Sequence, residues 1–210
     1  MVELRLIENP SEVEKRKEKS YSHDHNQVWT YVEHMLHANF ELKGLQGKRV
    51  LEIGGAHPEN IGNYCLNELR AGYTNRTLDE KCKDLPHTSI GEIMTFNDAP
   101  YDVVFSNGVF ECGAIDFPST EQMAQNTLRY IKWIMTNSQR VQKYNLNGPK
   151  KLYELTAKNG KVIINTISHP CIFTTHALEK AGFRVLARQR RDIYNVNTPS
   201  SENELVILEK

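Results

Sequence analysis

The sequence feature that most constrains the fold is a short apolar strand that runs directly into a pair of glycines. Residues 48–53 read KRVLEI, and Gly54, Gly55 and Ala56 follow at once. Glycine lets the backbone adopt dihedral angles that a Cβ atom would forbid, and it lets a ligand approach the backbone closely. In open α/β sheets a turn of this kind follows the first strand and holds a nucleotide. The segment therefore predicts an open α/β sheet with a ligand crevice at this turn.

Strand-like and helix-like segments alternate along the rest of the chain, which predicts a mostly parallel sheet with helices on both faces. Only a loop, residues 194–203, joins the last two predicted strands, so we expect the final strand to run antiparallel beside its predecessor. We predict further strands at residues 74–78, 91–96, 101–106, 161–167, 183–189 and 204–209, and helices at residues 59–70, 119–145, 149–158 and 174–181.

The N-terminal part of the chain departs from this alternation. Residues 24–43 place apolar side chains on one helical face, and Gly44 follows them as a helix stop. We therefore expect residues 1–44 to form an N-terminal helical segment, or lid, in front of a single domain at residues 45–210.

The net charge of the chain argues against a nucleic-acid partner. The chain of 210 residues carries 26 basic and 26 acidic side chains, whereas nucleic-acid binders usually show a basic excess. We therefore expect no DNA partner and interpret the cluster of Arg188, Arg190 and Arg191 as a solvated strand edge. No apolar stretch approaches the roughly 18 residues of a membrane span, and the charged N-terminus is unlike a secretory signal. We expect a cytoplasmic protein with no membrane partner.

A metal site is not expected. The four cysteines are far apart and form no CxxC pair, which argues against a zinc site or a disulfide framework. His23 with His25, and His34 with His37, have usable ligand spacing. No third ligand is fixed beside them, however, and exposed helical histidines are common.

Two acidic residues near the glycine turn predict the chemistry of the ligand. Glu52 ends the first strand facing the crevice, where a carboxylate would repel a pyrophosphate and attract an ammonium group. This charge favours S-adenosylmethionine over NAD. Asp79 ends the next strand, at roughly the spacing from Gly54 at which an acid accepts hydrogen bonds from ribose hydroxyls. The adjacent Glu80 is the alternative.

The sequence resembles the class I S-adenosylmethionine-dependent methyltransferases over about residues 45–210, through the ordered segments VLEIGG, TLDE, GEIMTF, YDVVFSNGVFE, AKNGKVIINT and ALEKAGFRVL. The resemblance implies a Rossmann-like seven-stranded sheet of order 3-2-1-4-5-7-6 with the last strand antiparallel. It also implies S-adenosylmethionine as the cofactor and methyl transfer as the activity. Matched position by position, it implies cofactor contacts from Glu52, Gly54, Gly55 and Ala56 to the amino-acid part, from Asp79 to the ribose, from Glu92 and Ile93 to the adenine, and from Ser106 and Asn107 to the methionine part.

Three departures from the family pattern bear on the substrate and on catalysis. Ala56 stands where the family usually has a second glycine, and Cys112 stands where many members have a histidine. The segment at 106–109 lacks the Asn-Pro-Pro-aromatic pattern of the enzymes that methylate amino groups of DNA and glutamine, which argues against those substrates.

The catalytic residues stay unassigned, with His25, His169 and Tyr21 as candidates. A hydroxyl or protonated amine acceptor needs a base to remove its proton. In the resembling family an N-terminal helix commonly closes over the cofactor, which would bring Tyr21, His25 and Trp29 to the pocket. The alternative is that the aromatic side chains pack on the sheet and the histidines face solvent. His169 follows a predicted strand at the cofactor edge, where a plain loop residue is the alternative role.

Four functions remain open at this point. The favoured one is a methyltransferase acting on the oxygen or nitrogen of a small molecule. The others are a methyltransferase acting on a protein or RNA residue, a non-catalytic S-adenosylmethionine-binding protein, and, most weakly, an NAD-dependent oxidoreductase. The sequence assigns no oligomeric state.

Overall fold

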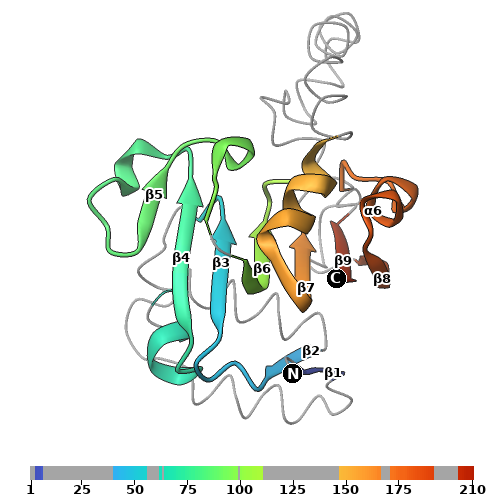
Figure 1. Ribbon diagram of the computed structural model, residues 1–210, viewed down its shortest axis with the longest axis horizontal. Helices are drawn as coiled ribbons and strands as arrows, with labels where there is room; N and C mark the ends of the chain where they lie inside the picture. The colour runs from blue at the N-terminus through green and yellow to red at the C-terminus, as the bar shows by residue number, and fades with distance from the viewer. Residues whose placement is uncertain are drawn as a thin grey trace, which may run out of the picture.

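The core of the molecule is a seven-stranded sheet of order β5-β4-β3-β6-β7-β9-β8 (Figure 1). The computed structural model describes residues 3–6, 40–55, 62, 64–98, 100–110, 147–166, 171–191 and 203–210. Neighbouring strands from β5 to β7 pair in parallel, whereas β9 runs antiparallel to both β7 and β8. The strands are β3 (Arg49–Ile53), β4 (Gly72–Thr77), β5 (Thr88–Ile90), β6 (Tyr101–Asn107), β7 (Thr156–Asn165), β8 (Arg184–Arg191) and β9 (Asn203–Glu209).

This arrangement confirms the predicted topology. Numbered within the sheet, the strands have the order 3-2-1-4-5-7-6, and the last strand in sequence, β9, is the antiparallel one. The strand order reverses between β3 and β6, which lie side by side. In open α/β sheets such a reversal leaves a crevice outside the carboxyl ends of the strands.

Central strands are apolar on both faces because both faces are covered. On one face Leu51, Val104 and Ile164 are fully buried, and on the other face Val50, Val103 and Ile163 are at most 1% exposed. Their burial explains why these segments read as continuous apolar runs rather than as alternating patterns.

Local sequence signals set the ends of the described helical elements. Helix α6 (Thr175–Ala181) begins where the Thr174 hydroxyl accepts a hydrogen bond from the Ala177 amide, and it ends at Gly182, whose φ is 108°. The predicted helix at 174–181 is thus confirmed. The other described helical segments are η1 (Tyr64–Glu68), η2 (Glu80–Cys82), η3 (Ile93–Thr95) and residues 147–155.

Three predicted elements were wrong in position or extent. The third strand is β5 at Thr88–Ile90, whereas the predicted strand at 91–96 is a turn that contains η3. The helix predicted at 149–158 ends at residue 155, and β7 begins at Thr156. The sequence favoured a later start for β7 because Asn159 and Gly160 are typical of turns. Here they lie within the strand, where Asn159 has a φ of 62°.

Residues 1–44 were predicted to form a helical segment, but both ends of this segment contain strands. Strand β1 (Glu3–Leu6) pairs antiparallel with β2 (Phe40–Lys43), so the last turn of the helix expected at 24–43 is a strand. Residues 7–39, and the predicted helix at 119–145, lie outside the described residues. None of the helices in the described part of the chain is long and apolar enough to cross a membrane.

Candidate functional site

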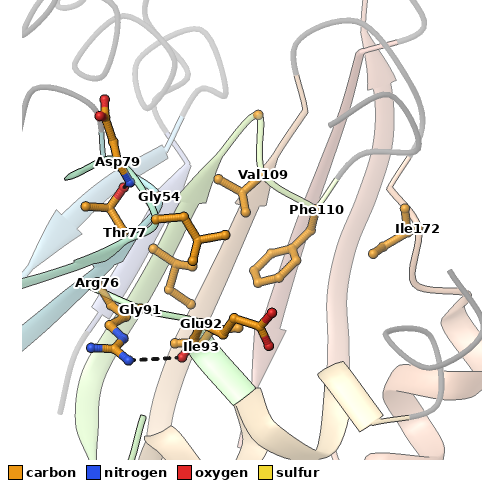
Figure 2. A pocket seen from close by; sticks show the side chains of 13 residues that line it. Gly54, Arg76, Thr77, Asp79, Gly91, Glu92, Ile93, Val109, Phe110 and Ile172 are labelled. Atoms are coloured by element: carbon orange, nitrogen blue, oxygen red, sulfur yellow. Dashed lines mark hydrogen bonds between the residues drawn. The ribbon is translucent and has the colours of Figure 1, made fainter. Parts of the chain in front are cut away.

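A cavity of about 310 Å³ opens at the carboxyl ends of β3, β4 and β6, beside the strand-order reversal. Its volume falls at the lower end of the range typical of small-molecule sites, roughly 300–1,000 Å³. Figure 2 shows its lining side chains converging from these three strand ends and from the segment before α6. They are Ile53, Gly54, Arg76, Thr77, Leu78, Asp79, Gly91, Glu92, Ile93, Gly108, Val109, Phe110 and Ile172.

The glycine turn after β3 forms one side of this cavity. Gly54 has a φ of 80°, and its amide donates to the Arg76 carbonyl over 2.8 Å. A Cβ atom at this position would overlap the side chain of Val109, which lies over the turn. The position therefore needs glycine for two separate reasons, its backbone conformation and the close approach of Val109.

Glu52 lies behind the turn rather than among the residues that line the cavity. Its side chain is 3 % exposed, and its carboxylate accepts a hydrogen bond from the Tyr73 hydroxyl. A Cβ on Gly55 would overlap this carboxylate, so the charge is packed against the backbone of the turn. Burial, helped by the Glu52 charge, raises the pKa of the neighbouring Cys65 thiol to about 12.

Asn75 holds the same turn from β4. Its side-chain oxygen accepts from the Gly55 amide over 3.2 Å, and its nitrogen donates to the Gly55 carbonyl over 3.0 Å. Asn75 is fully buried, so this pair of bonds satisfies both of its polar ends. Sequence reasoning missed it, although an asparagine in the middle of a buried strand is a usable signal.

Asp79 lies at the rim of the cavity directly after β4, as predicted. Its carboxylate accepts from the Lys81 amide over 3.0 Å, and its own amide donates to the Thr77 hydroxyl over 3.2 Å. These bonds start η2 and hold Asp79 at the edge of the cavity, with its carboxylate directed away from the other lining side chains (Figure 2). The alternative acid, Glu80, does not line the cavity.

Glu92 and Ile93 line the cavity from the segment after β5. Arg76 holds this segment by donating to the Ile90 carbonyl over 2.7 Å and to the Glu92 carbonyl over 3.2 Å (Figure 2). Its guanidinium also lies over the Phe96 ring, 5.1 Å from the ring centroid. Arg76 is a second residue that sequence reasoning missed, because its partners are backbone groups more than ten residues away.

Ser106 lies at the end of β6, opposite Ile53 of β3 in the sheet register. It is 1 % exposed, and among the described residues its hydroxyl has no hydrogen-bond partner. Leaving a buried hydroxyl unpaired costs about 1–3 kcal/mol. Ser106 is not among the residues that line the cavity.

Several predicted site residues cannot be placed. Asn107 ends β6, but its side chain, like Ala56, Cys112 and the candidate bases Tyr21, His25 and His169, lies outside the described residues. Within the described part of the chain no three His, Cys, Asp or Glu side chains are grouped to hold a metal ion. The histidine pairs at 23–25 and 34–37 also lie outside that part.

The far wall of the cavity is apolar. Val109 and Phe110 follow β6, and Ile172 reaches the cavity from the segment before α6. The Ile172 amide donates to the Phe110 carbonyl over 2.9 Å, and the rings of Phe110 and Phe173 lie 5.0 Å apart. In Figure 2 this wall lies across the cavity from Asp79.

The interpretation of Arg188 as part of a solvated edge was wrong. Its Nε and Nη2 atoms bind the two carboxylate oxygens of Glu204 at 2.7 and 3.1 Å. Burial by itself would lower the pKa of Arg188, but the hydrogen bonds and charge of Glu204 outweigh it and raise the pKa. The guanidinium is therefore charged and paired, although its side chain is only partly buried. The side chains of Arg190 and Arg191 lie outside the described residues.

No family model and no curated protein matches the chain by sequence. Solved structures match it in fold. The 1,6-didemethyltoxoflavin N1-methyltransferase of Burkholderia thailandensis, solved with 1,6-didemethyltoxoflavin and S-adenosylhomocysteine, has a TM-score of 0.53 and 14% identity, covering 96% of this chain and 88% of its own. A candidate methyltransferase of Haloferax volcanii in complex with the Trm112 methyltransferase activator has a TM-score of 0.52 and 11% identity, covering 98% and 97%.

A candidate sarcosine dimethylglycine methyltransferase of Galdieria sulphuraria has a TM-score of 0.50 and 9% identity, covering 79% of this chain and 80% of its own. At such identities the likeness concerns the fold. Together with the strand order and the single antiparallel strand, it establishes one conclusion. The chain has the fold of the class I S-adenosylmethionine-dependent methyltransferases.

Proposed function

We propose that this protein is a methyltransferase that binds S-adenosylmethionine in the cavity at the carboxyl ends of β3, β4 and β6. The observation that carries the proposal is the lining of this one cavity. Gly54, Asp79, Glu92 and Ile93, four residues matched to cofactor contacts by the sequence resemblance, all line it. The similar fold of an enzyme solved with S-adenosylhomocysteine supports the same assignment.

The side chains at the β4 end of the cavity suit an adenosine group. One oxygen of Asp79 is bound by the Lys81 amide, and a carboxylate has further lone pairs with which to accept from ribose hydroxyls. Glu92 would accept from the adenine amino group. Leu78, which is 60% exposed at the rim, and Ile93 offer apolar surface that the flat ring would cover.

The glycine turn and β6 suit the amino-acid part of the cofactor. Gly54 lines the cavity in a left-handed backbone conformation, and the buried Ser106 hydroxyl lacks a partner among the described residues. The Glu52 carboxylate behind the turn adds negative potential that favours an ammonium group over a pyrophosphate. This charge argues against the NAD-dependent alternative.

S-adenosylmethionine supplies a methyl group already activated on a sulfonium, so the protein must orient the acceptor and exclude water. Val109, Phe110 and Ile172 form an apolar wall suited to that task. Of the described residues that line the cavity, Arg76, Asp79 and Glu92 are the ionisable ones, and none belongs to this wall. A general base would come from elsewhere, and His25, His169 and Tyr21 remain the proposed candidates.

A small-molecule acceptor, methylated on oxygen or nitrogen, is the favoured substrate class. The fold neighbour from Burkholderia acts on a small heterocycle, and the chain's balanced charge offers no bulk attraction to nucleic acid. Since Arg188 is paired with Glu204, one basic residue that supported an RNA acceptor is already engaged. A protein or RNA acceptor remains the second candidate, and the fold neighbour solved with a methyltransferase activator protein does not distinguish the two substrate classes.

Calorimetric titration with S-adenosylhomocysteine tests the proposal. Asp79→Asn keeps an oxygen for the Lys81 amide but removes the charge. It should weaken binding at least about tenfold, or 1.4 kcal/mol, since hydrogen bonds to charged groups contribute about 1.5–3 kcal/mol. The matched control is Glu80→Gln, a change in the next residue, which does not line the cavity and should leave affinity within about twofold. Equal affinity in the two folded variants would show that the ribose contact is misplaced.

A further inference from the structure

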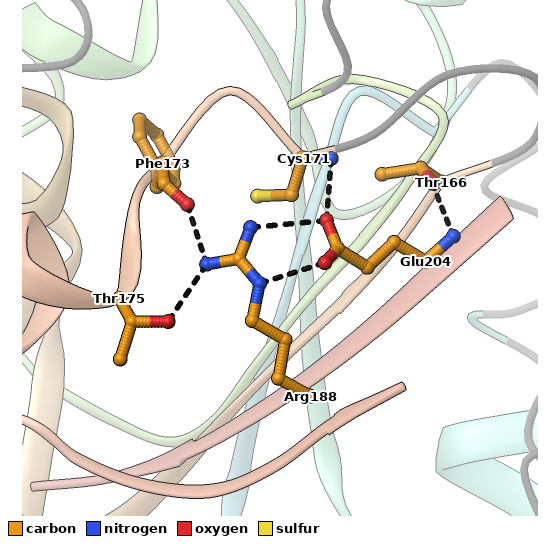
Figure 3. Close-up of polar contacts among 6 residues, drawn as sticks. All are labelled: Thr166, Cys171, Phe173, Thr175, Arg188 and Glu204. Atoms are coloured by element: carbon orange, nitrogen blue, oxygen red, sulfur yellow. Dashed lines mark hydrogen bonds and ion pairs between the residues drawn. The ribbon is translucent and has the colours of Figure 1, made fainter. Parts of the chain in front are cut away.

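Ile172 is held from both sides by one half-buried ion pair, that of Arg188 with Glu204. The amide of Cys171, the residue before it, donates to Glu204 Oε2 over 2.8 Å. The carbonyl of Phe173, the residue after it, accepts from Arg188 Nη1 over 2.9 Å (Figure 3). The two charged side chains thus bind the backbone on either side of Ile172, which is the residue of the segment 171–173 that lines the cavity.

The hydrogen bonds between Arg188 and Glu204 fix the orientation of the two side chains as well as the distance between them. Arg188 and Glu204 form two parallel N–H···O bonds, at 2.7 and 3.1 Å, and Glu204 is 4% exposed. Such bidentate pairs hold both planar groups in one relative orientation. Arg188 donates further to the Thr175 hydroxyl over 3.2 Å, and the Glu204 amide donates to the Thr166 hydroxyl over 2.7 Å (Figure 3). These bonds tie the pair to the start of α6 and the end of β7.

Neither charged residue lines the cavity, so the pair acts on the cavity through residues 171–173, which it holds. The Ile172 amide donates to the Phe110 carbonyl, and the Phe173 ring packs against the Phe110 ring. A shift of residues 171–173 would therefore move Ile172 and Phe110, two of the three apolar residues at the far wall. Asp79 would stay in place, because it is fixed by its own bonds to Thr77 and Lys81.

We propose that Arg188 and Glu204 are positioning residues for the acceptor side of the cavity, acting through Ile172. This inference rests on the proposed function, because it takes the Asp79 and Glu92 side as the place of the cofactor. A purely structural role would be different. In that case the pair would stabilise the β8–β9 edge of the sheet but would not affect the position of the acceptor beside the cofactor's methyl group.

The test uses S-adenosylmethionine labelled with ¹³C in its methyl group and follows the bound methyl resonance by NMR. Arg188→Lys keeps the charge but cannot make the bidentate pair and also reach Phe173. We expect a resolved change in the methyl chemical shift, with cofactor affinity within about threefold of the wild-type value. Ile172→Val leaves the pair intact and should shift the same resonance.

The matched control is Arg184→Lys. Arg184 also lies on β8 and pairs with an acid of β9, Glu209, but its side chain is 70% exposed and bonds to neither Cys171 nor Phe173. The methyl resonance should be unchanged in this variant. In the double variant of Ile172 and Arg188 the shift should differ from the sum of the two single-variant shifts, because both changes act on the same wall of the cavity.

Each outcome separates the two proposals. If the wild-type protein does not bind the labelled cofactor, the proposed function fails and this inference fails with it. If the cofactor binds but the methyl resonance of Ile172→Val or of folded Arg188→Lys equals that of the wild type, the positioning role is overturned and the proposed function stands. Additive shifts in the double variant would also overturn it. Should Arg188→Lys not fold, Glu204→Gln provides the second perturbation of the pair, with the same expected change.

Discussion

At the scale of single residues, the cavity depends on positions where one side chain decides whether a ligand can approach. Gly54 is of this kind because its φ is positive and Val109 lies against it. It could be predicted from the sequence, since a glycine-rich turn directly after the first strand of an open α/β sheet is where a nucleotide binds. The roles of Asn75 and Arg76 could not be predicted, because these side chains bind backbone groups that come near them only when the chain folds.

Gly54→Ala should therefore weaken both stability and cofactor binding. A left-handed conformation costs an alanine about 1–2 kcal/mol, and the overlap with Val109 adds to that. Gly47 is the matched control, because its φ is 71° but a Cβ there would meet nothing within 4 Å. Urea unfolding should show a larger loss for Gly54→Ala than for Gly47→Ala, and titration with S-adenosylhomocysteine should show lost affinity in the former alone. Equal effects of the two changes would contradict this account of the turn.

The ionisation of the Cys65 thiol reports whether water reaches the space behind the turn. Its pKa is raised from 9.0 to about 12, mainly by burial and further by the Glu52 charge. The thiol is neutral in both the folded and unfolded chain below pH 9, so stability is unaffected there. Between pH 9 and about 12 the unfolded thiol ionises first, so this group lowers the stability as pH rises.

The corresponding measurement is alkylation by iodoacetamide at pH 9, read out by peptide mass spectrometry. Only the thiolate reacts readily. Cys65 should stay unmodified in the folded protein and be modified in urea at the same pH. Modification at equal rates in both states would show that the residue is exposed.

At the scale of helices and strands, the sequence predicted an element correctly where the residues that start and stop it lie within the element's own segment. Helix α6 was predicted because Thr174 and Gly182 supply its start and stop within the segment itself. The segment at 91–96 was wrongly predicted as a strand because its apolar residues face the cavity and the core from a turn. That turn exists because Arg76 and the Thr77 carbonyl bind it from β4, which is information the segment does not contain.

Arg76→Lys should loosen this turn and weaken cofactor binding. A lysine cannot donate to the Ile90 and Glu92 carbonyls in the fixed geometry of a guanidinium. Since each lost hydrogen bond is worth about 0.5–1.5 kcal/mol, we expect about tenfold weaker binding of S-adenosylhomocysteine in a calorimetric titration.

Arg49→Lys is the control for this prediction. Arg49 also stacks on an aromatic ring, that of Tyr101, but it begins β3, at the opposite end of the strand from the cavity. Its replacement should leave the affinity unchanged. If both lysine variants bound S-adenosylhomocysteine as tightly as the wild type, Arg76 would have no part in shaping the site.

At the scale of the whole molecule, the sheet order determines where a ligand can bind. The reversal between β3 and β6 and the antiparallel β9 were both predictable, the first from the resemblance and the second from the short final connection. The pairing of Arg188 with Glu204 was not, because the two residues lie on different strands and read separately as surface charges. Long-range pairs of this kind are the part of the site that sequence reasoning did not supply.

The most direct test of the central claim is a crystal structure of the protein with S-adenosylhomocysteine. We predict that the adenosyl group occupies the cavity beside the Gly54 turn, with its ribose hydroxyls donating to Asp79 and its adenine next to Glu92 and Ile93. A structure in which this cavity stays empty while crystals contain saturating ligand, or in which the ligand binds elsewhere on the chain, would contradict the claim.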